Sequence, residues 1–299
     1  MTPPAPKPAA SPAPDRATPG RPARWPDAGF WTLTGVVTAG YLVLLLCLLA
    51  ADVAYLATGG QATANDAEAA ATNPLAQALA DPNIRYSIHL TLVSCTITAV
   101  LSVMVATPIG YLLARARFPG KALVDTLLDI PIVLPPLVIG LSLLILFQYL
   151  PRSIREAVVY QTPAVVLSQF VVASAFAIRA MRVAFDQIDP RLEQVARTLG
   201  ASRLQALGWV VLPEAGPGLL TAGTLAWARS LGEFGPLLVF AGATRGKTEV
   251  LSTTVFLELS IGNLQGAVAV SLLMIFAAVS LLTLTRLLGG RRLSDHRPT

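Results

Sequence analysis

Residues 186–213, DQIDPRLEQVARTLGASRLQALGWVVLP, form a polar stretch between two long apolar parts of the chain. The stretch is too polar to lie in lipid, and its capping signals predict two short helices. Asp189 is a suitable N-cap for the first, and Gly200 suits the left-handed residue after its last turn. Ser202, followed three residues later by Gln205, begins the second helix as in a capping box.

The first of these helices has one apolar face. Leu192, Val195, Ala196 and Leu199 recur at i, i+3, i+4 and i+7, which is the spacing of a single helical stripe. A helix of this kind beside a membrane either packs against its own membrane domain or docks into a groove on a partner. The periodicity leaves both interpretations open.

Outside this stretch, the chain is apolar enough to cross a membrane several times. It is 54% hydrophobic and 13% charged, against roughly 25% charged in an ordinary soluble domain. Five uncharged runs exceed the roughly 20 residues that a spanning helix needs. These runs are 30–51, 86–114, 130–151, 157–178 and 259–285. A sixth span is interrupted by Arg229 and Glu233, and such a polar pair is tolerated when it faces a bundle interior.

We therefore predict an all-α polytopic membrane protein with about six transmembrane helices. The expected spans are about 30–56, 86–114, 128–151, 157–181, 214–244 and 259–287. Residues 1–29 are expected to form a disordered Pro/Ala-rich cytoplasmic tail, because a proline-rich segment of this kind cannot bury a core. Residues 30–288 form the expected transmembrane domain, with the polar loop at 182–213, and residues 289–299 form a second cytoplasmic tail.

Basic residues are concentrated on one side of the expected spans. The N-terminus, 115–125, 179–214 and the C-terminus hold 16 of the 22 lysines and arginines. Because loops rich in Lys and Arg stay in the cytoplasm, both termini are predicted to be cytoplasmic. The net charge of +5 comes from short clusters rather than a continuous face, so no nucleic-acid partner is expected. With two cysteines in apolar runs and two histidines, neither a disulfide framework nor a metal site is indicated.

The polar loop resembles a known pattern. Cytoplasmic loops of binding-protein-dependent ABC importer permeases carry Glu-Ala-Ala, three residues, Gly, nine residues, and then Ile-x-Leu-Pro. This chain matches that spacing without a gap. The resemblance implies the type I ABC importer permease fold, in which the first loop helix is a coupling helix that inserts into a cleft of the ATP-hydrolysing subunit. The residues it assigns to coupling are Leu192, Glu193, Gln194, Val195, Ala196, Arg197, Leu199, Gly200, Leu212 and Pro213.

Two positions depart from that pattern. Gln194 stands where the family usually has Glu, and Val195 stands where it usually has Ala. An ion pair that the Glu would make with the ATPase becomes a neutral hydrogen bond here. Glu193, the neighbouring residue, is a candidate to replace the missing charge.

Two further stretches resemble permeases of the molybdate, tungstate and sulfate group. The first runs from Arg115 to Gly140 and contains DIPIVLPPLVIG, and the second is ARSLGEFG at 228–235. The similarity covers about residues 86–288 and implies the import of an oxyanion such as molybdate or tungstate. Sulfate is an alternative solute, and so are phosphonate, iron and thiamine, because their permeases share parts of these patterns.

Five residues in these stretches are candidates for the translocation path or for an interface. Pro131, Pro135 and Pro136 remove three backbone donors near the start of a span, which predicts a broken or kinked entry. Such a break should face protein or a water-filled cavity, so a pathway lining and a kinked packing helix both remain open. Arg229 and Glu233 lie at i and i+4 and can pair on one helix face. The pair is either a structural anchor, or Arg229 adds positive potential to an anion path.

The resemblance also implies an assembly. Its parts are a second copy of this chain, two ATP-binding subunits and an external solute-binding protein, in the lipid of a bacterial-type plasma (inner) membrane. The chain is expected to be a multi-pass transporter subunit rather than an enzyme, with no cofactor of its own and with ATP and Mg²⁺ on the partner ATPase. A membrane enzyme is disfavoured because His89, Asp52 and Glu233 lack a partner motif. A passive channel or a scaffold is the other alternative.

Overall fold

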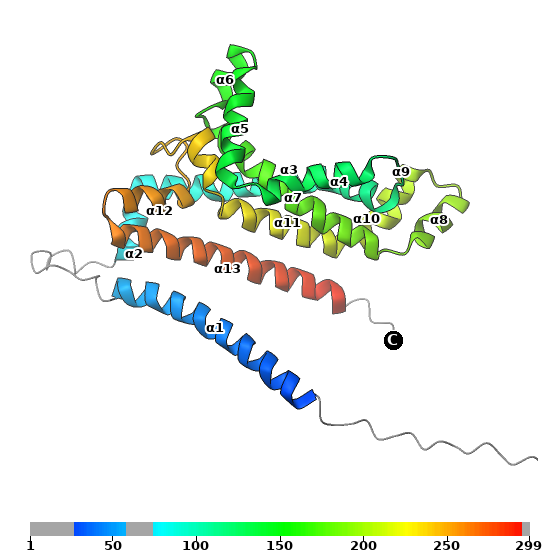
Figure 1. Ribbon diagram of the computed structural model, residues 1–299, viewed down its shortest axis with the longest axis horizontal. Helices are drawn as coiled ribbons and strands as arrows, with labels where there is room; N and C mark the ends of the chain where they lie inside the picture. The colour runs from blue at the N-terminus through cyan, green and yellow to red at the C-terminus, as the bar shows by residue number, and fades with distance from the viewer. Residues whose placement is uncertain (1–26, 58–73, 295–299) are drawn as a thin grey trace, which may run out of the picture. The chain divides into compact units, whose positions relative to one another are not determined.

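The computed structural model describes residues 27–57 and 74–294, and every regular element in these ranges is a helix (Figure 1). The longer helices are α1 (Asp27–Ala57), α3 (Pro82–Arg115), α7 (Thr162–Gln187), α11 (Gly216–Leu231) and α13 (Leu264–Ser294). The shorter ones are α2 (Pro74–Ala80), α4 (Lys121–Val133), α5 (Pro136–Gln148), α6 (Arg152–Val158), α8 (Pro190–Thr198), α9 (Arg203–Ala206), η2 (Leu207–Val211), α10 (Leu212–Glu214), η3 (Leu237–Ala241) and α12 (Leu251–Ser260). The all-α expectation is confirmed.

The chain divides after Ala51 into two units, each of which is described by itself. In the first, residues 27–51 form most of α1, which carries apolar side chains on every side. A helix that is apolar all round suits a lipid environment. The second unit begins at Asp52 and contains the remaining helices and the polar loop.

The second unit is built around three helices. α3 and α7 pack along each other, α11 packs against both, and α13 packs against α11 and α12 (Figure 1). Their shared core combines small residues such as Ala106 and Ala226 with larger ones such as Leu113, Met181 and Phe185. Small side chains let membrane helices approach closely, so van der Waals packing can hold them together. α5 and α6 project away from these helices (Figure 1).

Four helices of the described residues are long and apolar enough to cross a membrane: Gly29–Ala57, Pro82–Arg115, Thr162–Gln187 and Leu264–Leu287. α4 and α5 add a fifth if the two together form one span. The count of six spans therefore stays a prediction. Two of the expected spans are interrupted, and both interruptions have a local cause.

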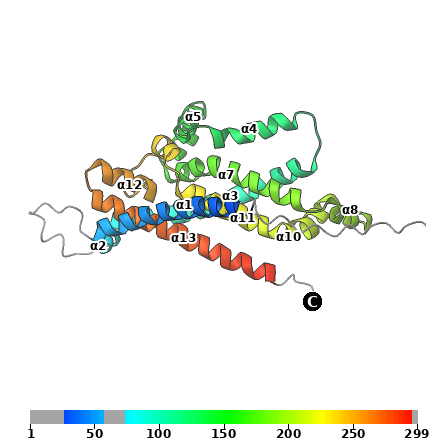
Figure 2. The ribbon, with the colours of Figure 1, turned by 60° about the horizontal axis from the view of Figure 1, so that its bottom comes forward.

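The expected span at 128–151 is two helices, α4 and α5, bent by 109° (Figure 2). The bend lies at Leu134, which is extended with ψ 142°, and at Pro135, while Pro136 is the first residue of α5. A residue that precedes proline avoids helical geometry, so the two consecutive prolines separate the helices. The break expected from the prolines is present, but Pro131 lies inside α4 and does not cause it.

The expected span at 214–244 is also not one helix. α11 ends at Leu231, and the chain becomes helical again at Gly235 before it forms η3. Gly232, Gly235 and Pro236 lie at this gap. The glycines weaken the helix because their backbone is flexible, and the proline weakens it because it has no backbone N–H donor. With 16 residues, α11 is shorter than the roughly 20 residues of a spanning helix. The continuous span is thus corrected to a helix, a break and a short π-helical turn.

The expected span at 157–181 corresponds to α7 with shifted ends. α7 begins at Thr162, because residues 152–158 form the separate helix α6, and it continues to Gln187. The polar loop therefore begins at residue 188 instead of 182.

The two expected tails are shorter than predicted where they are described. α1 begins inside the expected tail 1–29, and α13 ends inside the expected tail 289–299. The expected disorder of residues 1–26 and the tail residues 295–299 lie outside the described residues.

Candidate functional site

The polar loop folds through the local signals that its sequence contains. Asp189 Oδ1 accepts a hydrogen bond of 2.9 Å from the N–H of Arg191 and caps α8. The N–H of Gln205 donates to Ser202 Oγ at 3.2 Å, and the N–H of Ser202 donates to Gln205 Oε1 at 2.8 Å, which completes the capping box. Gly200 has φ 94° after the end of α8, a conformation that favours glycine.

The apolar face of α8 is not covered by the described part of the chain. Leu192, Val195 and Leu199 are 45%, 56% and 84% exposed. Leu204 on α9 and Trp209 on η2 are also exposed. The structure therefore does not show the packing of this face against its own membrane domain. Contiguous exposed apolar side chains of this kind are typical of a docking surface.

The opposite side of α8 is bound to α3. Tyr111 Oη donates a hydrogen bond of 2.8 Å to Glu193 Oε1. Arg115 Nη2 donates one of 2.7 Å to the carbonyl oxygen of Ile188, at the end of α7. Glu193 is thus held within its own chain through one oxygen, and its replacement of the charge missing at Gln194 stays a prediction.

The other residues assigned to coupling lie around two hollows on either side of α8. Ala196, Leu199 and Gly200 line one of about 410 Å³, which η2 closes on its far side. Gln194 and Arg197 line the other, of about 300 Å³, which lies next to the end of α3. α8 consequently has an open apolar side and a polar side that faces its own chain.

Leu212 and Pro213 lie apart from α8. Leu212 is half-buried against the core that includes Val211 and Ala215. Pro213 is exposed in the first turn of α10. The pair connects the polar loop to α11, and its assignment to coupling stays a prediction.

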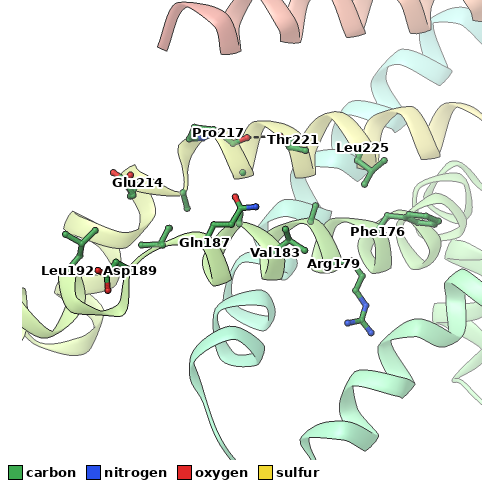
Figure 3. Close-up of a pocket in the computed structure, with 15 residues that line it drawn as sticks. Phe176, Arg179, Val183, Gln187, Asp189, Leu192, Glu214, Pro217, Thr221 and Leu225 are labelled. Carbon is green, nitrogen blue, oxygen red and sulfur yellow. Dashed lines mark hydrogen bonds between the residues drawn. The ribbon is translucent and has the colours of Figure 1, made fainter. Parts of the chain in front are cut away.

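A groove of about 830 Å³ runs between α7 and α11 and ends at α8 (Figure 3). Figure 3 shows Phe176 at one end of it and Leu192 at the other. Its lining is mainly apolar, with Gln187, Glu214 and Thr221 among its polar side chains. A largely apolar hollow with a few polar groups is the usual form of a ligand site.

Arg229 lies on α11 one turn beyond Leu225, which lines this groove. Its Nη1 is 2.7 Å from Glu233 Oε2, and its guanidinium carbon is 5.7 Å from the ring centroid of Phe176. The first contact has the distance of an ion pair but not the angles of a hydrogen bond, and Glu233 is buried. The pairing predicted from the spacing is confirmed, although Glu233 lies beyond the end of α11. The contact with Phe176 places Arg229 next to the groove.

An ion-pair network that the sequence analysis missed joins α4 to α7. Arg179 donates to Asp129 Oδ1 at 2.5 Å and to Asp125 Oδ1 at 2.7 Å. Arg182 Nη1 donates to both carboxylate oxygens of Asp125 at 2.6 Å. Figure 3 shows Arg179 turned away from α11. The sequence does contain one signal for this network. Asp125 and Asp129 lie four positions apart, and Arg179 and Arg182 lie three apart, so the members of each pair lie on one face of their helix.

The two helix breaks contact each other. A Cβ atom on Gly235 would lie 2.7 Å from the backbone nitrogen of Leu137, and one on Gly140 would lie 2.6 Å from the Cα of Pro236. A side chain at either position would clash with the backbone of the other segment, so the two segments can cross only because both positions are glycine. The structure thereby brings the start of α5 close to the segment that contains Glu233.

Comparisons with known proteins agree with this geometry. The profile of the family described as "Binding-protein-dependent transport system inner membrane component" matches residues 106–293. The molybdate/tungstate transport system permease protein WtpB of Thermococcus kodakarensis is 39% identical over 167 residues, which are 56% of this chain and 65% of that protein. The chain thus spans slightly less than two thirds of this relative. The sulfate transport system permease protein CysT of Salmonella typhimurium is 32% identical over 226 residues, which are 72% of this chain and 81% of that protein.

The fold also matches a solved structure. A bacterial ABC transporter involved in the import of the acidic polysaccharide alginate contains a chain that is similar with a TM-score of 0.62 and 20% sequence identity. The match covers 92% of this chain and 99% of that chain. At this identity, the likeness supports the fold.

Proposed function

Because the chain belongs to the family of binding-protein-dependent transport system inner membrane components, we propose that it is the membrane-spanning permease subunit of an ATP-driven importer. Molybdate or tungstate is the proposed solute, since the Thermococcus relative is named for these anions. Sulfate is the second candidate, because the Salmonella relative is a sulfate permease. In this role the chain forms the translocation path, and ATP and Mg²⁺ are bound and used on a separate partner chain.

The observation that carries the proposal is the exposed apolar face of α8 within the matched loop. Docking of this face into a cleft of an ATP-binding subunit would bury side chains that the described part of the chain leaves open. The polar side of α8 is hydrogen-bonded to α3 through Tyr111 and Glu193, and Arg115 joins α3 to the end of α7. A displacement of α8 would therefore be passed to both membrane helices.

The proposed assembly contains two copies of this chain, two ATP-binding subunits and one external solute-binding protein. α8 and both termini face the cytoplasm, as the distribution of basic residues supports. A ligand shifts a conformational equilibrium only by its differential affinity for the two states. The loaded binding protein must therefore favour the state in which the path is open to the outside.

Arg229 and the prolines at the bend are proposed to lie along the path. Support for this comes from the position of Arg229 next to the groove between α7 and α11. A guanidinium group with a side chain 27% exposed can add positive potential for an anion even while it is paired with Glu233. The crossing of the two helix breaks near Pro136 places irregular backbone there, which in lipid is tolerated where it faces protein or a cavity.

The experiment that tests this function is ATP-driven uptake by proteoliposomes that contain this chain, its ATPase and its binding protein. Labelled molybdate, tungstate and sulfate are offered, with phosphate as the control. We expect uptake of molybdate or tungstate that excess sulfate does not block. Uptake of sulfate instead would transfer the assignment to the second candidate. ATP hydrolysis without entry of any oxyanion would contradict the solute assignment, and uptake without the ATPase would favour a passive channel.

A further inference from the structure

The hollow of about 300 Å³ between the end of α3 and the loop helices, here called the basic pocket, has an unusual charge balance. Its lining residues include three arginines, Arg115 from α3, Arg197 from α8 and Arg203 from α9. Glu193 is the carboxylate among its lining residues, and Tyr111 holds it by a hydrogen bond. Three cations therefore share one carboxylate.

These guanidinium groups are not neutralised elsewhere in the described part of the chain. None of the three has a carboxylate oxygen within 4.0 Å there, whereas Arg179 and Arg182 on α7 are both ion-paired. Arg115 is held in place by the hydrogen bond that it donates to the carbonyl oxygen of Ile188.

We propose that the basic pocket binds a tetrahedral oxyanion, either a free anion such as phosphate, sulfate or molybdate or the phosphate of an anionic lipid headgroup. Guanidinium groups are planar forks that donate paired hydrogen bonds to such oxygens. The pocket has room for an anion together with several waters, since one water occupies about 30 Å³ of liquid. The site lies on the polar loop, so it is distinct from the proposed translocation path, and its binding can be measured without transport.

Gln194 is consistent with this ligand. Its side chain lines the basic pocket, and its amide NH₂ can donate a hydrogen bond to an anion. A glutamate at the same place would add a second carboxylate, which would repel an anion and pair with the arginines. The neutral residue therefore keeps the pocket positive.

A bound anion would fasten the loop. It would bridge Arg115 on α3 to Arg197 on α8 and Arg203 on α9, three elements that otherwise meet through few polar contacts. Since the apolar face of α8 points away from this pocket, the anion would hold α8 in one position relative to α3 while that face stays open. Occupancy would thus influence how α8 is presented to a partner.

The test uses the full-length chain in phosphatidylcholine nanodiscs at low salt, with labelled phosphate, sulfate and molybdate in equilibrium dialysis. We expect saturable binding by the wild type and an affinity at least about tenfold lower in Arg203→Gln, because one charge-assisted hydrogen bond is worth at least that factor. Arg203 is exposed, so its loss should not impair folding. Gln194→Glu should also weaken binding. Arg117→Gln, an exposed arginine outside the pocket, is the matched control and should change affinity less than twofold.

A second arm identifies the source of the anion. Replacing part of the phosphatidylcholine with phosphatidic acid should abolish phosphate binding if a headgroup occupies the pocket, and should leave it unchanged if a free anion does. Either result supports the site, provided that Arg203→Gln weakens phosphate binding in pure phosphatidylcholine. Absence of saturable binding by the wild type in pure phosphatidylcholine would overturn the proposal. Equal losses in Arg203→Gln and Arg117→Gln would also overturn it, because they would show a diffuse basic surface.

Discussion

Arg229 and Glu233 show how a membrane protein tolerates a buried carboxylate. Glu233 is 1% exposed, and its carboxylate oxygens have no hydrogen-bond donor in the described part of the chain, so Arg229 is the neutralising group that the structure gives it. Removing one partner of a buried ion pair leaves the other charge uncompensated, at a cost of about 3–5 kcal/mol. Both the anchoring and the path interpretation of Arg229 depend on this pair.

We predict that Arg229→Ala slows ATP-driven uptake in proteoliposomes more than Arg229→Lys, because lysine keeps the positive charge. The double variant Arg229→Ala/Glu233→Gln separates the two roles. If the pair only anchors the helix, the double variant should recover thermal stability and uptake together. If Arg229 also serves the anion, stability should recover while uptake stays low. Near-normal uptake in both single variants would remove Arg229 from the mechanism.

Glu249, in the segment between η3 and α12, is a second buried acid. It is 1% exposed, and its Oε2 has no hydrogen-bond partner among the described residues. Burial raises the pKa of its carboxyl above the usual range. The folded chain therefore keeps this proton to a higher pH than the unfolded chain, in which the pKa is about 4.3. The free energy of unfolding should fall as the pH rises above that value, until the folded group has also ionised.

The variant Glu249→Gln should lose this part of the pH dependence. Its thermal midpoint should match that of the wild type near pH 4 and exceed it near pH 8, as measured by scanning fluorimetry in detergent. Glu156→Gln is the control, because Glu156 is exposed on α6. Parallel curves for wild type and Glu249→Gln would show that burial does not disfavour the charge at this position.

At the scale of elements, α4 is attached in an uncommon way. It has no buried residue, it is bent by 109° from α5, and its carboxylates Asp125 and Asp129 bind Arg179 and Arg182 on α7. These groups are only partly exposed, so solvent screens them less than surface pairs. The network therefore joins α4 to α7, together with the half-buried Leu128, which packs against the core.

We expect Asp125→Asn to weaken this attachment, because it removes the carboxylate that both arginines share. Hydrogen exchange followed by mass spectrometry should show faster exchange of the α4 amides, with little change in α3 or α11. Glu156→Gln again serves as the control, since the exposed Arg152–Glu156 pair contributes little. Unchanged protection of α4 in Asp125→Asn would show that other contacts hold the helix.

At the scale of the whole molecule, the proposed function depends on α8 as a docking element. Ala196→Asp puts a charge beside Leu199 in the hollow that α8 shares with η2. Since the partner cleft would have to bury this charge, the variant should no longer co-purify with the ATPase. Ser153→Asp, the same type of change at an exposed position on α6, should leave co-purification intact. Wild-type recovery of the ATPase with Ala196→Asp would exclude the docking role of this face.

Much of the loop could be predicted because its signals are local. The cap at Asp189, the capping box of Ser202 and Gln205, and the turn at Gly200 each depend on residues within a few positions of one another. The Arg229–Glu233 pair was predictable for the same reason, because the two residues are four positions apart. The continuity of the span at 214–244 was wrongly predicted, because its apolar composition does not reveal that Gly232, Gly235 and Pro236 interrupt the helix.

The sequence by itself determined the all-α membrane class, the position of the polar loop and the helices within it, since length, hydropathy and capping act over short distances. Only the tertiary structure decided which side of α8 is open, that Glu193 binds Tyr111, and that Arg115, Arg197 and Arg203 line one pocket. It also decided that Asp125 and Asp129 meet two arginines 50 or more positions away. Such contacts join residues far apart in the chain, and only the packing of α3, α7 and the loop helices against one another brings them together.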